Sequence, residues 1–310
     1  MKSLKQQARR ASLSLCLVLA PLGAGAEVAF TQIAEFDVPE ADQGVAVDKD
    51  YFYAVDNRTI AKYDKATGAL VDRWDDAEGG PMIHLDSAMV RNGRIYAAHS
   101  NYRQLPMTSS IEVWDASTME HIGSYSLGRN LGSFTWFDYH DGYWWGVFAN
   151  YDRLGPDGKP YGGTINTTLA QFDKDWNILQ TWIFPRELLV RFADMSNSGG
   201  SWGPDGYLYL TGHDLAEVYR VRLPDIGSVL EVEEIIPLNV HGQGIAWDRR
   251  EKTVLYGILR ATDEEQAQGI GNKVVVFQSN IPPQLADRNS RLWQAREQTG
   301  CPGPGCSSHP

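Results

Sequence analysis

Four of the seven histidines follow a common pattern: each stands beside other polar residues at an end of a short apolar stretch. His84 is followed two residues later by Asp86, and His241 is followed at the same spacing by Gln243. The imidazole group changes its charge near neutral pH and also binds transition metals. These histidines could therefore transfer protons or hold a metal ion.

His84, Asp86 and His241 form the predicted catalytic set. His84 and His241 would act as general bases, or as ligands of a divalent metal that polarises a carbonyl group or activates water. Asp86 would orient a histidine. The spacing matches no standard metal-binding motif, so the sequence leaves the cofactor open. The alternative is structural, because polar side chains in such places also bond to neighbouring backbone.

A second set of polar residues is predicted to contact the substrate: Gln43, His99, Asn197, His213, Asp214, Gln243 and Arg260. Arg260 could clamp a carboxylate with its planar guanidinium group, or it could pair with the acidic residues of the TDEE that follows it closely. His213 and Asp214 could equally form a turn. Gln43 and Gln243 could instead cap buried strands.

These residues recur because the sequence repeats. The stretch QGVAVDKDYFYAVDNRTIAKYDKATGALVDRW (43–74) and the stretch beginning DSAMVRNGRIYAAHS (86–127) share an order of strand, turn, strand centred on tyrosine, and strand ending in aromatic-Asp. Apolar alternation with Gly and Asp turns indicates an all-β chain. Four strands every 45 residues or so are typical of the blades of a β-propeller.

Five inner strands are expected, beginning near residues 43, 86, 135, 199 and 243. The last unit lacks a fourth strand, and the segment 29–39 can supply it and close the ring. Six blades are the alternative, because 135–198 is long. In a propeller the starts of inner strands and the ends of second strands share one face. The long loops 101–110, 152–168 and 260–273 are expected there, which makes this face the predicted site.

The composition sets limits on location and partners. Residues 1–26 have a basic start, an apolar middle and a small-residue end at Ala26, which predicts a cleaved signal peptide and a periplasmic or secreted product without a membrane anchor. Without the four basic residues of this segment, 24 basic and 39 acidic residues remain, a formal charge of −15. Nucleic acid is therefore not an expected partner. Residues 27–283 are the predicted propeller, and 284–310 a tail in which Cys301 and Cys306 would form a disulfide.

The inner-strand segments QGVAV and GQGIAWD resemble those of plant-type glutaminyl cyclases, which are five-bladed propellers. A signal peptide followed by blades is also similar to exported bacterial propellers described as cycloisomerases or lactonising enzymes. These resemblances imply intramolecular cyclisation or lactone chemistry. In the cyclases an acidic residue of the pore stands where Asp86 stands here.

We therefore expect an exported five-bladed enzyme that acts on a small polar substrate at the channel mouth by cyclisation, lactone hydrolysis or elimination. The alternative is a non-catalytic module that binds a glycan or a partner protein through loop aromatics such as Tyr102 and Tyr161. A purely structural scaffold is a third hypothesis.

Overall fold

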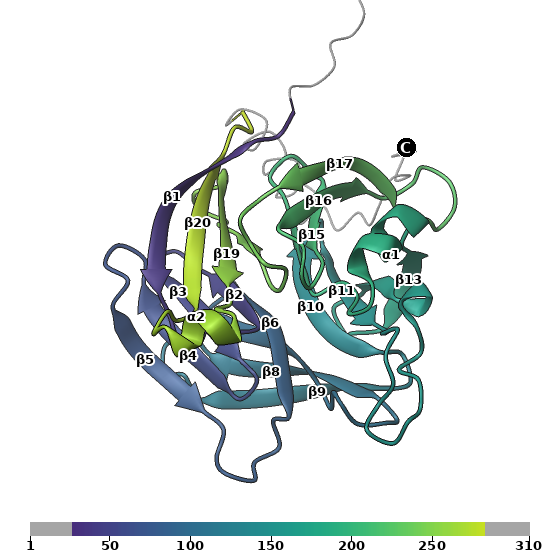
Figure 1. Cartoon of the computed structure of the whole chain (residues 1–310), viewed down its shortest axis with the longest axis horizontal. Helices are drawn as coiled ribbons and strands as arrows, with labels where there is room; N and C mark the ends of the chain where they lie inside the picture. Colours follow the sequence, from purple (N-terminus) through teal and green to yellow (C-terminus); the bar gives the residue numbers. More distant parts are fainter. Residues whose placement is uncertain (1–26, 283–310) are drawn as a thin grey trace, which may run out of the picture.

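The computed structural model describes residues 27–282. The predicted signal peptide and the predicted Cys301–Cys306 disulfide lie outside these residues. Within them the chain forms five antiparallel sheets of four strands each, as the sequence predicts (Figure 1).

Each of the first four blades uses four consecutive strands. The first blade contains β2 (Gly44–Val47), β3 (Tyr51–Asp56), β4 (Thr59–Asp64) and β5 (Leu70–Asp75). The second contains β6 (His84–Arg91), β7 (Arg94–Ser100), β8 (Thr108–Asp115) and β9 (His121–Arg129). The third contains β10 (Ser133–His140), β11 (Tyr143–Ala149), β12 (Thr168–Phe172) and β13 (Ile178–Ile183). The fourth contains β14 (Gly199–Trp202), β15 (Leu208–Thr211), β16 (Glu217–Arg222) and β17 (Glu231–Pro237).

The fifth blade joins the two ends of the described chain. It contains β18 (Ala246–Trp247), β19 (Val254–Leu259), β20 (Lys273–Ser279) and, as its outer strand, β1 (Phe30–Asp37). β1 pairs antiparallel with β20 from Phe30 opposite Ser279 to Asp37 opposite Lys273. The innermost strands contact one another in a closed circle, β2 with β6, β10, β14, β18 and β2 again. The predicted closure by the N-terminal strand is confirmed, and the number of blades is five.

Glycines let the inner strands approach one another closely at the axis. A Cβ atom added to Gly244 would lie 1.8 Å from Ser87 Oγ and 2.8 Å from the Cα of Gly44. The backbone N–H of Gly244 also donates to the carbonyl oxygen of Gln43 at 3.0 Å, a usual length for such a bond. The repeated Gln-Gly pair therefore links the first blade to the fifth.

Burial decreases from the axis outward. All four residues of β2 and of β14 are buried, whereas the outer strands β5 and β13 are mostly exposed. The aromatic run at 135–152 packs mainly inside the protein: Trp136 and Trp145 are buried in one core cluster with Trp202.

Within the described part of the chain, three short helical segments interrupt the β structure, although the sequence shows no convincing helical stretch. They are α1 (Arg186–Phe192), α2 (Asp263–Ala267) and the 3-10 turn η1 (Thr164–Asn166). α1 buries Leu188, Leu189 and Phe192 and connects the third blade to the fourth. Among the described residues, no helix combines the length and apolar character needed to cross a membrane.

Candidate functional site

One end of the channel opens into a cavity of about 590 Å³. The starts of inner strands, the ends of second strands and two long loops line it, as the propeller geometry predicts. Its lining comprises Asp42, Gln43, Asn57, His84, Asp86, Tyr102, Arg103, Gln104, Tyr151, Pro156, Met195, Ser198, His213, Gln243 and Arg260. Six of the ten predicted site residues are among them.

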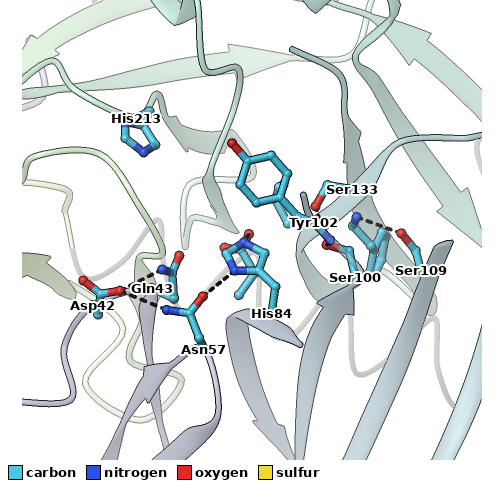
Figure 2. A network of polar contacts seen from close by, with 12 residues as sticks. Asp42, Gln43, Asn57, His84, Ser100, Tyr102, Ser109, Ser133 and His213 are labelled. Atoms are coloured by element: carbon cyan, nitrogen blue, oxygen red, sulfur yellow. Dashed lines mark hydrogen bonds and ion pairs between the residues drawn. The ribbon is translucent and has the colours of Figure 1, made fainter. Parts of the chain in front are cut away.

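A chain of polar contacts fixes His84 at the wall of the cavity (Figure 2). His84 Nδ1 lies 2.5 Å from Asn57 Oδ1, and the amide of Asn57 reaches Asp42 Oδ2 at 3.4 Å. Gln43 donates to the same oxygen at 2.8 Å. Because an amide oxygen only accepts, His84 donates from Nδ1, and this tautomer keeps the Nε2 lone pair of the neutral ring available.

Asp86 is the buried carboxyl of the site. The residue is 3 % exposed, its Oδ2 lies 3.5 Å from His84 Nε2, and its Oδ1 has no hydrogen-bond partner among the described residues. Burial raises the pKa of Asp86, and the nearby His84 and Arg260 oppose that rise only in part. A carboxyl group of this kind exchanges a proton at a higher pH than an ordinary aspartate.

Arg260 and Gln243 form the opposite part of the lining, with His213. Gln243 has a φ of 65° and follows Gly242 with a φ of 66°, and this left-handed pair turns the chain before β18. With the amide oxygen of Gln243 turned toward Arg260, it accepts from Nη2 at 2.9 Å and from Nη1 at 3.2 Å. Arg260 Nη2 also lies 3.3 Å from His213 Nε2.

His213 is held from its other side by Asp214, whose Oδ1 lies 2.5 Å from Nδ1. Burial lowers the pKa of His213 more than Asp214 raises it. The ring is therefore neutral near pH 7, donates from Nδ1 to the carboxylate and accepts at Nε2 from Arg260. Asp214 itself is 62 % exposed at its side chain and does not line the cavity.

An aromatic wall stands above His84. The ring of Tyr102 lies 5.2 Å from the ring of His84 and 5.0 Å from that of Tyr151, so the loop after β7 covers this side of the cavity. Tyr161, from the loop after β11, donates from its hydroxyl to the carbonyl of Arg103 at 2.8 Å. Tyr161 is 5 % exposed and ties the two loops together.

His99 and Asn197, two further predicted site residues, do not line the cavity. His99 bonds through Nδ1 to Ser110 at 2.9 Å and accepts from the backbone N–H of Ile83 at 3.1 Å. Asn197 is fully buried; its oxygen accepts from the indole of Trp136 at 2.6 Å. The structure does not bring either one to the cavity.

His241 is exposed and does not line the cavity. Among residues 27–282, no group of three or more His, Cys, Asp or Glu side chains is arranged to hold a metal ion.

Several cavity residues were not among the predicted set. Asn57 and Asp42 lie beside predicted positions, at the end of β3 and immediately before Gln43. The shared face of strand starts and second-strand ends was the signal that could have found them. Met195 and Ser198 follow α1, which the sequence did not predict, and no signal pointed to Met195.

No protein-family model matches the sequence, and no curated protein matches it either. Solved structures that share the propeller fold do match. One is the glutaminyl cyclase of Myxococcus xanthus, with a TM-score of 0.48 and 10% identity over 81% of this chain and 96% of that one. Another is a streptogramin B lyase, with a TM-score of 0.43 and 15% identity over 74% and 80%. The WD40 repeats of RRP9 match with a TM-score of 0.42 and 11% identity over 76% and 79%.

Proposed function

We propose that this chain is an enzyme that performs acid–base chemistry on a small polar substrate at the channel mouth. The reaction class is cyclisation, lactone hydrolysis or elimination, and the acting pair is His84 and Asp86. The observation that carries the proposal is Asp86, a buried carboxyl that lines the cavity and keeps one oxygen without a partner among the described residues. Titratable groups with shifted pKa values in a cavity are typical of active sites. Export from the cytoplasm, which the segment 1–26 predicts, is part of the same proposal.

The two groups would divide the proton transfers between them. In lactone hydrolysis, His84 Nε2 accepts a proton from water while the oxygen of that water forms a bond to the carbonyl carbon. The ring C–O bond then breaks, and protonated Asp86 donates its proton to the leaving alkoxide. In cyclisation the same steps run in reverse: the substrate hydroxyl gives its proton to the Asp86 carboxylate as its oxygen bonds to the carboxyl carbon, and protonated His84 gives its proton to the departing water. In elimination His84 takes the proton from carbon, the bond to the leaving group breaks as the double bond forms, and Asp86 gives its proton to the leaving group.

The test is turnover by the mature chain of a panel of small lactones, hydroxycarboxylic acids and glutaminyl peptides. For any member that is converted, we expect Asp86→Asn and His84→Gln each to lower kcat by ~10²–10⁴, which is the usual contribution of a general acid or base. His241→Ala is the matched control, because it removes an exposed imidazole outside the cavity, and it should leave kcat unchanged. Full activity in both cavity variants would refute the assignment.

The alternative is a binding module for a glycan or a partner protein, and Tyr102 is the residue that favours it, since its ring lines the cavity. It predicts saturable binding without turnover, lost in Tyr102→Ala and kept in His84→Gln. Tyr161 cannot offer a stacking surface in this role, because it is buried between the two loops.

A further inference from the structure

Arg260 carries a positive charge that its neighbours do not neutralise. Its hydrogen-bond partners are the amide oxygen of Gln243 and the ring of His213, neither of which is an anion. Within residues 27–282, no carboxylate lies within 4.0 Å of the Arg260 guanidinium. Most other arginines of the propeller form an ion pair with a carboxylate. The closest comparison is Arg249 at the other end of the channel, which pairs with buried Asp138.

The neutral partners also fix the orientation of the guanidinium group. Gln243 accepts from both terminal nitrogens, and His213 accepts from one of them. His213 is in turn held by Asp214. These three bonds use both N–H groups of Nη2 and one of Nη1, so the Nε–H and the second Nη1–H remain as donors to an anion. Asp214, through His213, and Asp86 act on this charge only from beyond ion-pair contact.

We propose that the cavity takes substrates that bear a carboxylate group, and that Arg260, oriented by Gln243 and His213, is the residue that binds it. This inference rests on the proposed function and names the substrate class of the same site. The reacting part of the molecule would then lie toward His84 and Asp86, which line the same cavity. Asp42 also lines it, and the side-chain amides of Gln43 and Asn57 already donate to its carboxylate.

The experiment measures binding by isothermal titration calorimetry with two probes of similar size, glutarate and its neutral diamide glutaramide. The mature wild-type chain should bind glutarate at least about tenfold more tightly, because charge-assisted hydrogen bonds are stronger than neutral ones. Arg260→Gln should weaken glutarate binding about 10- to 100-fold, and Arg260→Lys should lie between, since a lysine keeps the charge but lacks the planar guanidinium group that Gln243 and His213 orient. Binding of glutaramide should change little.

Two further variants guard the interpretation. Arg103→Gln makes the same change of charge at an exposed arginine of the same cavity, and we expect it to weaken glutarate binding no more than about threefold, because an exposed charge is screened. Gln243→Glu keeps Arg260 but gives it a carboxylate partner of the same shape, and it should abolish the preference for glutarate even if Arg260→Gln does not fold. Equal affinity of the wild-type chain for both probes, or equal losses in Arg260→Gln and Arg103→Gln, would overturn the proposal.

Asp86→Asn separates this proposal from the catalytic one. If both hold, that variant loses turnover and keeps its affinity for glutarate. Selective glutarate binding by a chain that turns over no substrate would leave the carboxylate site standing and remove the proposed enzyme. Turnover without selective binding of glutarate would leave the proposed enzyme standing and remove the carboxylate site.

Discussion

Asp86→Asn should make the protein more stable at neutral pH. The substitution keeps the shape of the side chain and removes a buried titratable carboxyl, which has one oxygen lacking a hydrogen bond among the described residues and which is therefore costly to ionise in the folded protein. Leaving a buried polar group unsatisfied costs about 1–3 kcal/mol, and more when the group is charged. Because the asparagine amide is also polar and buried, we expect the free energy of unfolding to rise by about 1–2 kcal/mol. This corresponds to roughly 2–4 °C in Tm for each kcal/mol in a domain of this size class.

The gain should depend on pH in a defined direction. Burial raises the pKa of Asp86 in the folded protein above the value of 3.8 that an exposed aspartate has. The stability that this carboxyl contributes is therefore fully present below its unfolded-state pKa and is lost as the pH rises through the folded-state pKa. Asparagine does not titrate. The difference between variant and wild type should be small at acidic pH, grow across that window and then level off.

The assay is urea unfolding of both proteins between about pH 3.5 and 8. Asp138→Asn is the matched control, because Asp138 is an equally buried aspartate that accepts from Ser201 Oγ at 3.0 Å and from the backbone N–H of Trp202 at 2.8 Å, and pairs with Arg249. Its loss should destabilise the protein at neutral pH by about 3–5 kcal/mol, the usual cost of breaking a buried pair. An Asp86→Asn variant that is less stable than wild type at neutral pH, or a difference that does not change with pH, would contradict the assignment of Asp86 as a strained functional group.

Three further predictions test the fold and the site. Gly244→Ala should lower the free energy of unfolding by at least about 2 kcal/mol, measured by chemical denaturation, because the new Cβ would lie 1.8 Å from Ser87 Oγ and 2.8 Å from the Cα of Gly44. Gly271→Ala is the comparison, because no heavy atom lies within 4 Å of the added atom and Gly271 has no positive φ, and an equal loss there would remove the steric argument. Deleting residues 27–39 should expose the edge of β20 and cause association, seen by size-exclusion chromatography, whereas a monodisperse product would show that β1 is dispensable. The pKa of His213, followed by NMR titration, should lie below the usual 6.5 and should fall further in Asp214→Asn, because Asp214 raises the pKa of His213. A rise of that pKa in the variant would contradict the assignment of a neutral His213 ring.

The fold could be predicted because its signal is local and repeated. Strand alternation, turn residues and aromatic-Asp pairs recur in each blade, and the Gln-Gly pair at 43 and 243 reflects a close approach of two inner strands. The face that carries the cavity could also be predicted, since antiparallel geometry places strand starts and second-strand ends together. Helix α1 could not, because its three buried side chains satisfy a packing need of the surrounding blades rather than a marked helical pattern.

Individual site residues were harder to predict than the face. His84 and His241 occupy equivalent places in the sequence repeat, but β6 begins at His84 whereas β18 begins only at Ala246. The left-handed Gly242 and Gln243 stand between His241 and that strand, so equivalent sequence positions do not occupy equivalent places in space. Asn197 shows a second limit, because its partner Trp136 comes from a neighbouring blade 61 residues away in sequence. Contacts of this range leave no trace in a single sequence.

The two ends of the channel use the same kinds of residue with opposite outcomes. At one end, buried Asp138 accepts hydrogen bonds from Ser201, Trp202 and Arg249, so charge and hydrogen-bonding needs are met within the protein. At the other end, Asp86 keeps an oxygen without a partner among the described residues and Arg260 has only neutral partners. A buried carboxyl oxygen without a hydrogen bond and a half-buried arginine without an anionic partner lower the stability of the fold. Evolution commonly tolerates such a loss where function requires it. The unsatisfied groups at the end with Asp86 and Arg260, and not the histidine pattern alone, are the physical reason to place the site there.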